Sequence, residues 1–403
     1  MPIGPACVRP EGGKGCLPLA PASRRVDLIE PVFSHPTAVT NPLHPTARPA
    51  QVVYGGTVDG KPFRTEVTRL PGVKVIHWQG QTIPALVSQY LAYSDGRVAE
   101  VALDWFAQAD DGAVWYLGED VREYEDGVVA TTEGSWEAGK GAPPAMIMPA
   151  TPRTGAVYRS ENAPGLVFEQ DTVLATGRTV TGPSGAVAGA IVVAELQADG
   201  ARENKVYAPG YGEFSTATEG ELEAVSIAVP ADTRPGPVPA RLTALSRAVR
   251  TMYDDVAAGN GSGAAYRSLR KAWRSYRPGG SLLDRQMGRD IALLGRAIGN
   301  PEAARAAALR VAQNELDQRL RYVPLATIER ARFELWRRQT AVDARAGDAA
   351  SVSGDVASLR WTWDRVRPAV SAAVARRVDG RLRTAAHAGP RTAARIVAAV
   401  RLS

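Results

Sequence analysis

The chain has 403 residues, of which 45% are hydrophobic and 22% are charged, and its formal net charge is +6. This composition is typical of globular proteins with real cores, and the length predicts about two or three domains. No run of about 18 apolar residues occurs, so no transmembrane helix is expected. The sequence also lacks a phosphate loop, HExxH, CxxC and GxSxG motifs, which argues against the enzyme classes that depend on them.

Residues 1–49 are rich in Pro and Gly and are expected to form an irregular lead-in. The only two cysteines, Cys7 and Cys16, are close enough in sequence to close a small loop through a disulfide in an oxidising compartment. Two unpaired thiols, or a Cys7 lipidated in a longer precursor, are the alternatives. The first 25 residues lack the apolar segment of a secretory signal, so either the chain is cytosolic or a leader has been removed.

Residues 50–229 are predicted to form an antiparallel β-domain, either a curved sheet or an open β-barrel. Asp-Gly dipeptides recur there, and Asp-Gly supplies the positive φ angles of tight hairpins. The dipeptides begin at Asp59, Asp95, Asp111, Asp126 and Asp199. A meander is expected around the middle three. Further strands are predicted at 51–58, 61–69, 73–78, 145–149, 165–177, 186–197, 203–208 and 221–229.

The pattern changes after residues 230–240, a linker whose four prolines cannot lie inside a helix or a central strand. In residues 241–403, apolar residues recur at steps of three and four, as in Leu242, Leu245, Val249 and Met252. This period predicts a basic bundle of six to eight α-helices. The predicted fold class is therefore α+β with segregated domains.

The two parts of the chain carry opposite charge. Residues 1–230 hold 17 Lys and Arg against 27 Asp and Glu, a balance of −10, while residues 231–403 hold 31 against 15, a balance of +16. The acidic β-domain is therefore expected to dock on the basic bundle, which would partly neutralise the acidic residues around Glu119.

Those acidic residues lie around the stretch "DDGAVWYLGED", residues 110–120. An EF-hand spelling fails, because the positions that need an acidic residue and a Gly hold Ala113 and Tyr116. A two-residue hairpin turn at 111–112 would instead place Asp104 opposite Glu119 and Glu100 opposite Glu123. All four carboxylates would then share one face of the sheet.

Like charges that face each other across strands destabilise a sheet unless a cation lies between them. These four residues are therefore the predicted metal site, and oxygen ligands favour Ca²⁺ or Mg²⁺. No other cofactor is predicted. A solvated or Arg-paired face and a glycosidase acid/base pair are the alternatives. A three-residue loop would pair Asp104 with Gly118 and send Glu119 to the other face.

The segment "YRSLRKAWRSYR", residues 266–277, interleaves basic and aromatic side chains. Its basic residues suit an anionic membrane or cell-wall surface. Nucleic acid is a less favoured partner, because the aromatic side chains fall on the core-facing side of the helix. The predicted anionic-surface residues are Arg267, Arg270, Lys271, Arg274 and Arg277.

Four segments between Asp104 and Phe214 carry a resemblance: "DWFAQADDGAVWYLGEDVREYEDG", "TEGSWEAG", "MIMPATPRTGAVYR" and "KVYAPGYGEF". In wording and order they resemble a family of uncharacterised bacterial secreted or lipoprotein-type proteins with VWYxGED, EGSWEAG, IMPA and YAPG motifs. The resemblance covers about residues 50–230 and implies an extracellular or cell-envelope location. It implies no activity, and it leaves the helical part unassigned.

Together these features predict a secreted or cell-envelope binding or adaptor protein without enzymatic activity, which binds an unknown ligand or envelope partner through its β-domain. The alternative is a metal-dependent hydrolase or cation-binding protein that uses the acidic face.

Overall fold

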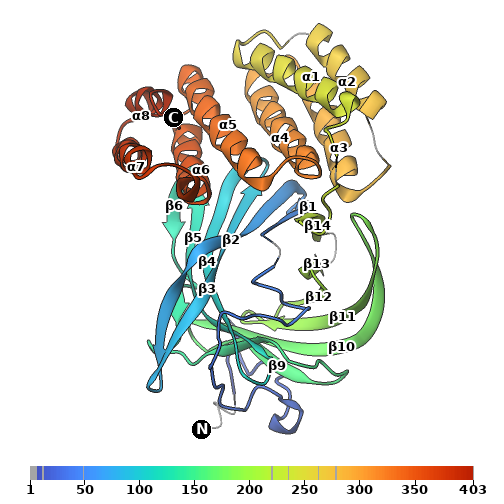
Figure 1. The fold of residues 1–403 in the computed structure, drawn as a ribbon, viewed down its shortest axis with the longest axis vertical. Helices are drawn as coiled ribbons and strands as arrows, with labels where there is room; N and C mark the ends of the chain where they lie inside the picture. Colours follow the sequence, from blue (N-terminus) through green and yellow to red (C-terminus); the bar gives the residue numbers. More distant parts are fainter. Residues whose placement is uncertain are drawn as a thin grey trace.

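The computed structural model describes residues 7–10, 13–48, 50–218, 221–234, 236–261, 263–276 and 279–402. An irregular lead-in is followed by a 14-stranded antiparallel sheet and then by helices, which confirms the predicted α+β class (Figure 1). The strands are β1 (Gln51–Val58), β2 (Lys61–Trp78), β3 (Gln81–Ser94), β4 (Arg97–Gln108), β5 (Val114–Glu125), β6 (Val128–Thr131), β7 (Trp136–Glu137), β8 (Ala145–Met148), β9 (Val157–Ala163), β10 (Val167–Gly182), β11 (Gly185–Gln197), β12 (Arg202–Ala208), β13 (Gly212–Thr218) and β14 (Glu221–Val229). The α-helices are α1 (Ala240–Ala257), α2 (Gly263–Tyr276), α3 (Leu282–Ala297), α4 (Pro301–Leu320), α5 (Leu325–Ala346), α6 (Ala349–Val366), α7 (Ala372–Ala386) and α8 (Pro390–Ala398).

Tight turns set the hairpins of the sheet. At the dipeptides that begin with Asp59, Asp95 and Asp126, both residues adopt positive φ, as the sequence predicts for two-residue turns. The strands were predicted less completely. β2 is one long strand rather than two, with an irregularity between Arg69 and Val73, and β9 and β13 were not predicted.

The sheet curves until its two ends approach each other. Its strand order is β6-β5-β4-β3-β2-β1-β14-β13-β12-β11-β10-β9, and β8 pairs with β5 near one end while lying beside β9 at the other. One face of the sheet therefore lines an interior, and part of the opposite face is covered by the helices (Figure 1).

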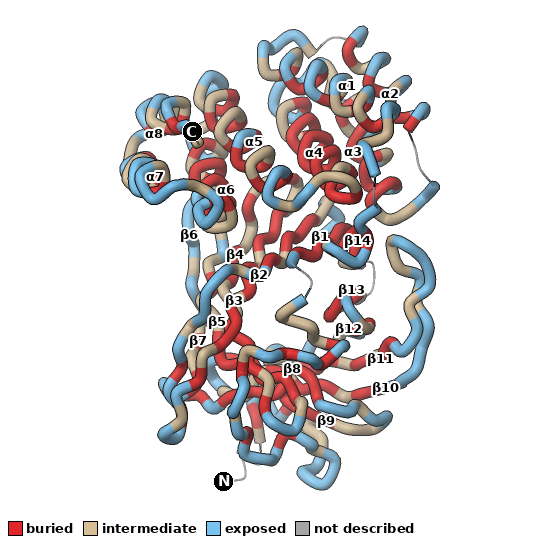
Figure 2. Tube along the Cα trace, in the orientation of Figure 1, coloured by how far each residue is buried: buried red, intermediate tan, exposed pale blue. Residues whose placement is uncertain are grey.

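The helices pack on the outer face of β1 to β4 and β14 through a shared hydrophobic core. Leu91, Tyr93 and Val101 of the sheet belong to the same buried cluster as Phe333 and Trp336 of α5. The rings of Tyr93 and Trp336 stack with centroids 5.4 Å apart. Figure 2 shows the buried side of each long helix turned toward the strands or toward the neighbouring helices.

A buried network of ion pairs joins the same two layers. Arg64 of β2 binds Asp317 of α4 through two hydrogen bonds of 2.7 Å. Glu66 of β2 lies 2.5 Å from Arg365 of α6 and 3.1 Å from Arg332 of α5. Three cations and three anions thus balance within the network, which consists of Arg64, Arg332, Arg365, Glu66, Asp317 and Glu329.

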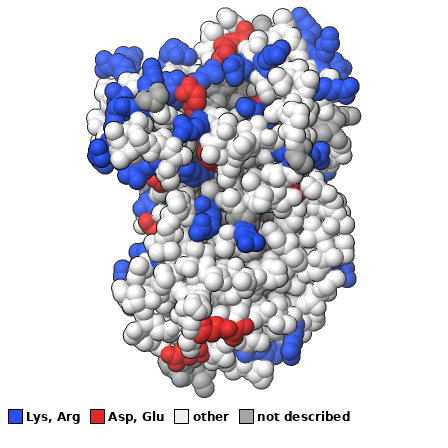
Figure 3. All heavy atoms as spheres, in the orientation of Figure 1, with Lys and Arg blue, Asp and Glu red and all other residues white. Residues whose placement is uncertain are grey.

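The acidic part of the chain therefore does dock on the basic part, but at the outer face of β2 rather than at the residues around Glu119. Figure 3 shows Lys and Arg gathered over the helices, while the surface over the strands carries few acidic side chains on this face of the molecule. Most carboxyl groups of the strands therefore do not lie on the face of the molecule that Figure 3 shows.

The lead-in carries the predicted disulfide. Cys7 and Cys16 are bonded, with an S–S distance of 1.99 Å. Among the described helices, none is both long and apolar enough to cross a membrane. The disulfide is compatible with an extracellular protein.

We predict that Arg332→Met destabilises the protein by about 3 to 5 kcal/mol, because it leaves buried carboxylates without their cation. Arg332 contacts Glu66, Asp317 and Glu329, and its side chain is almost fully buried. Arg337→Met on the same helix is the control; it removes the more exposed pair with Glu334 and should cost less than about 1 kcal/mol. Urea denaturation measures both, and equal losses would contradict the importance of the buried network.

Candidate functional site

The hairpin that carries "DDGAVWYLGED" has a three-residue turn. The amide of Ala109 donates a 2.9 Å hydrogen bond to the carbonyl oxygen of Ala113, and Gly112 adopts a φ of 92°. Beyond the turn, Gln108 pairs with Val114. Of the two turn lengths considered from the sequence, the three-residue loop is the one that forms, and the two-residue turn at 111–112, from which the acidic pairing was derived, does not. Taken alone, the observed turn would place Asp104 opposite Gly118.

A β-bulge restores the predicted pairing. Between Asp104 and Phe106 the register shifts, so that two residues of β5, Leu117 and Gly118, oppose the single residue Trp105. After the bulge Asp104 faces Glu119, and Glu100 faces Glu123. The predicted acidic face therefore forms, although the turn that was expected to produce it does not.

Gly118 makes this bulge possible. Its φ is 128°, and a Cβ atom at this position would lie 2.3 Å from the carbonyl oxygen of Trp136 on the adjacent strand β7. Because of the bulge, Tyr116 and Glu119 point to the same side although they are three residues apart. The Tyr116 hydroxyl donates a 2.9 Å hydrogen bond to Asp104.

Three of the four predicted acidic residues lie in the interior of the curved sheet, and the fourth, Glu123, is exposed. The interior face carries further carboxyl groups on β9 to β14. Here the cross-strand pairs include Glu161 with Glu169, and Asp171 with Glu195. We call the whole set the carboxyl ring; its members are Glu100, Asp104, Glu119, Glu161, Glu169, Asp171, Glu195, Glu203, Glu213 and Glu223.

Neighbouring carboxyl groups of the ring act on one another electrostatically, and these interactions connect its members around the interior. Burial and, to a smaller extent, the charge of Asp104 raise the pKa of Glu119 to about 8. Glu119 and Glu161 share a hydrogen bond, and the pKa of Glu161 is raised well above its ordinary value by burial and by Glu119. Glu161 is also acted on by Glu195.

Electrostatic interactions also connect Glu195 back to Asp104 through the other members of the ring. Burial is the main cause that raises the pKa of Glu203 to about 7, and Glu195 and Glu213 add to it. The pKa of Glu223 is also raised to about 7 by burial, with contributions from Glu213 and Glu100. Since Glu100 is in turn acted on by Asp104, the sequence of interacting carboxyl groups runs around the whole interior.

The ring encloses one ammonium group of the chain itself. Lys205 Nζ lies 2.8 Å from Glu195 and 3.4 Å from Glu203. Burial alone would raise the pKa of Glu195, but the charge and hydrogen bond of Lys205 outweigh it and lower the pKa. In contrast, the fully buried Asp171 has no regular hydrogen bond to either carboxyl oxygen among the described residues, and burial raises its pKa well above the ordinary value.

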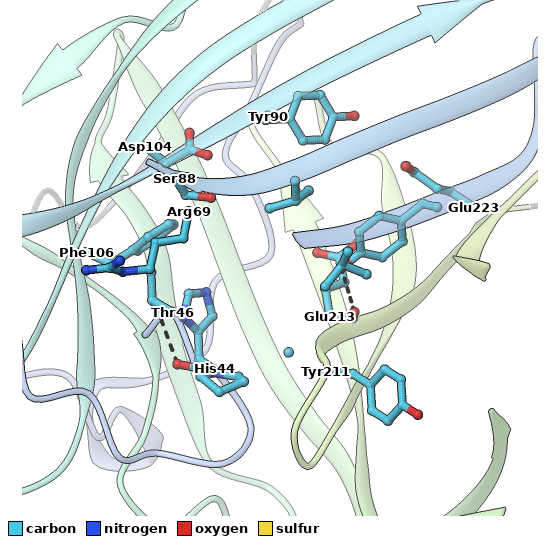
Figure 4. Close-up of a pocket in the computed structure, with 15 residues that line it drawn as sticks. His44, Thr46, Arg69, Ser88, Tyr90, Asp104, Phe106, Tyr211, Glu213 and Glu223 are labelled. Carbon is cyan, nitrogen blue, oxygen red and sulfur yellow. Dashed lines mark hydrogen bonds between the residues drawn. The ribbon is translucent and has the colours of Figure 1, made fainter. Parts of the chain in front are cut away.

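Next to the ring lies a cavity of about 190 Å³ (Figure 4). Its walls include members of the carboxyl ring on β4, β13 and β14. They also include aromatic side chains and the exposed, positively charged side chain of Arg69 on β2. Oε1 of Glu223 is buried there and accepts no hydrogen bond of regular geometry from the described residues. The main polar and aromatic lining residues are Asp104, Glu213, Glu223, Tyr54, Tyr90 and Phe106.

The lead-in completes the wall of the cavity. The amides of Thr40 and Asn41 donate hydrogen bonds of 2.8 and 2.9 Å to Gln108 at the end of β4, and the carbonyl of Pro42 accepts one of 2.8 Å from Gly210, before β13. His44 follows, with its ring edge-on to Phe106 at 4.7 Å. Burial lowers the pKa of His44 to about 4, so this imidazole is neutral at physiological pH.

The described residues contain no group of three or more His, Cys, Asp or Glu side chains arranged to hold a metal ion. The carboxyl groups are distributed around the wall rather than converging on one point. The Ca²⁺ or Mg²⁺ site at Glu100, Asp104, Glu119 and Glu123 therefore stays a prediction.

The predicted basic surface lies on α2, at the far side of the bundle from the sheet (Figure 1). Arg267, Arg270, Lys271 and Arg274 are exposed, while Trp273 and Tyr276 are buried, as the spacing predicts. Arg277 lies outside the described residues. Binding of this surface to an anionic membrane or cell wall stays a prediction.

Most of the ring was missed from the sequence. The available signal was a set of acidic residues two positions apart, such as Glu169 and Asp171, which must share one face of a strand. The sequence does not reveal whether that face lines the interior. His44 was also missed, because the Pro-rich lead-in gave no sign that it returns to the sheet.

No family model, curated protein or solved structure matches the chain. The resemblance of residues 50–230 to a bacterial secreted family therefore stays a prediction, and the site is interpreted from its own chemistry.

We predict that Gly118→Ala destabilises the protein by more than about 2 kcal/mol, because the new Cβ would collide with the backbone of β7. Gly141→Ala is the matched control: Gly141 also has a positive φ, but nothing lies within 4 Å of the added atom. It should cost about 1 kcal/mol. Thermal and urea unfolding compare the two, and equal costs would argue against a sterically required bulge.

We also predict that the free protein is more stable at about pH 5.5 than at about pH 8. Glu100, Asp104 and Glu223 have pKa values of about 7 when folded, mainly because of burial, whereas carboxyl groups of an unfolded chain ionise near 4. Between these values the folded state holds more protons than the unfolded state. The free energy of unfolding therefore falls as pH rises, by up to about 1.4 kcal/mol per pH unit for each group.

Urea denaturation across this range measures the effect. Glu223→Gln should reduce the loss of stability at high pH, because the amide does not ionise, whereas Glu123→Gln at the exposed position should have a smaller effect, because Glu123 acts on the pH dependence only through the pKa of Glu100. A stability that rises toward pH 8 would contradict the buried state of the ring.

Proposed function

We propose that this protein is a binding protein that holds a small organic cation in the cavity beside the carboxyl ring. The single observation that carries the proposal is the contrast between two parts of the ring. Around Lys205, an ammonium group already pairs with Glu195 and Glu203. At the cavity, Oε1 of Glu223 is buried and makes no hydrogen bond of regular geometry with the described residues, and the hydrogen-bond donor near this carboxyl group is the neutral hydroxyl of Thr65 rather than a cation.

The energetics of burial support a cation at this place. A buried carboxylate without a partner is costly, so the group loses its proton only at a higher pH than an exposed carboxyl group does, and a nearby positive charge favours the ionised form. The ring holds ten carboxyl groups, and Lys205 is the cation bound to two of them. A cationic ligand would supply the missing charge, with charge-assisted hydrogen bonds of the kind that Lys205 makes.

The cavity walls favour an organic cation over a bare ion. Tyr54, Tyr90 and Phe106 contribute aromatic rings to the lining. Aromatic faces attract alkylammonium groups and at the same time accept their carbon atoms. The spread of the carboxyl groups around the wall also suits a ligand with several atoms better than one coordinated ion.

The proposal fits a binding role in the cell envelope or outside the cell. The disulfide between Cys7 and Cys16 supports an oxidising compartment. The helical bundle would act as the adaptor part, with the exposed basic side of α2 as its surface for an anionic partner. Catalysis is not required by any of these features.

We predict that 1,6-diaminohexane binds the full chain at about pH 8 and that Glu223→Gln weakens the binding by about tenfold or more. One charge-assisted hydrogen bond is worth about 1.5 to 3 kcal/mol, which corresponds to that factor. Isothermal titration calorimetry measures the affinity. Glu123→Gln is the control, because this carboxylate is exposed and lies outside the cavity.

The same titration at about pH 5.5 should give weaker binding, since the amine must displace protons from the ring. An absence of heat and of thermal stabilisation at both pH values, with hexylamine as well as with 1,6-diaminohexane, would show that the proposed function is wrong.

A further inference from the structure

We infer that the occupant of the cavity is a linear diamine, with one ammonium group held by Asp104 and another held by Glu213 and Glu223 on the opposite wall. This inference rests on the proposed function and names the class of its ligand. The argument depends on where the carboxyl groups lie relative to one another and on what lies between them.

The two groups of carboxylates belong to distant strands. Asp104 lies on β4, Glu223 on β14 and Glu213 on β13, and three strands separate β4 from β14 in the sheet. At about 4.8 Å between neighbouring strands, β4 and β14 are about 19 Å apart along the curved sheet. The distance across the interior is shorter because the sheet curves. Figure 4 shows Asp104 on one side of the cavity and Glu213 and Glu223 on the other.

The carboxyl groups on both walls are positioned to accept hydrogen bonds from an ammonium group. On one wall, the Tyr116 hydroxyl fixes the carboxyl group of Asp104 by its 2.9 Å hydrogen bond to Oδ1. On the other wall, Glu213 accepts a hydrogen bond from Thr216, and Glu223 keeps a buried oxygen without a hydrogen bond of regular geometry in the described part of the chain. An ammonium group offers three donors, so one such group can serve both Glu213 and Glu223.

The surface between the two walls is mainly apolar and aromatic. Val52 of β1 and Val67 of β2 form a cross-strand pair, and both line the cavity together with the rings of Tyr54 and Tyr90. Methylene groups of a linear chain gain free energy when they are buried against such a surface. A single small cation would satisfy only one wall and would leave this apolar stretch exposed to water.

Arg69 favours the same class of ligand over one that is positively charged along its whole length. Its side chain is exposed and lines the cavity from β2, opposite Ser88, which in turn pairs with Asp104. Because β2 lies between β4 and β14 in the sheet, the positive charge of Arg69 disfavours a third ammonium group in the middle of the ligand. The charges of the ligand are therefore expected at its two ends.

The test compares diamines of three to eight methylene groups with monoamines of the same length, by isothermal titration calorimetry on the full chain at about pH 8. We expect the affinity of the diamines to pass through a maximum with length. The best diamine should bind at least tenfold more tightly than the matched monoamine. This comparison needs no substitution and so does not depend on whether a variant folds.

Variants then assign the two ends. Asp104→Asn and Glu223→Gln should each reduce the affinity for the best diamine to the level of the monoamine, while Glu123→Gln should change neither affinity. Glu213→Gln provides a second variant of the far wall if Glu223→Gln lowers the melting temperature.

The outcomes separate this inference from the proposed function. Equal binding of monoamines and diamines, or an affinity that does not depend on chain length, would show that the two-ended ligand is wrong while leaving the cation site standing. Absence of binding by every amine would overturn both.

Discussion

The arrangement of the molecule depends on a buried charge network on the outer face of β2. The side chains of Arg64 and Glu66 project from that face. They form ion pairs with Asp317, Arg332 and Arg365, which belong to three different helices. Burying an ion costs several kcal/mol, so such a network is tolerated only when every charge finds its partners. Hydrophobic packing holds the helices against the sheet, and the paired charges add directional contacts that favour one position of the helices over its neighbours.

The same strand presents the opposite situation on its other side. Thr65, Val67 and Arg69 alternate with the residues of the network and turn toward the interior. There the acidic groups of the neighbouring strands outnumber the cations, and burial raises most of their pKa values. Positive and negative charges are therefore equal in number in the network on the outer face, whereas acidic groups are in excess on the interior face. This difference between the two faces is the physical basis of the proposed cation-binding role.

The sequence was sufficient for the class of each element and insufficient for the register. Asp-Gly turns at Asp59 and Asp95 and the helical period after residue 240 follow local rules, and both were predicted correctly. The pairing of Asp104 with Glu119 was also predicted, but through a turn that does not exist. The pairing results from the bulge at Gly118. This glycine packs closely against β7, which lies outside the β4–β5 hairpin. Likewise, acidic residues of β9 to β14 were visible in the sequence, but their common interior depends on how far the whole sheet curves, which no local pattern encodes.

The segment around His44 carries a consequence for how such a protein can change. It is not a strand, it holds its place by a few hydrogen bonds to Gln108 and Gly210, and yet it supplies part of the wall of the cavity. Mutations in this segment would alter the size and polarity of the cavity without disturbing any strand pairing. The shape of the cavity and the stability of the sheet therefore depend on separate stretches of the chain.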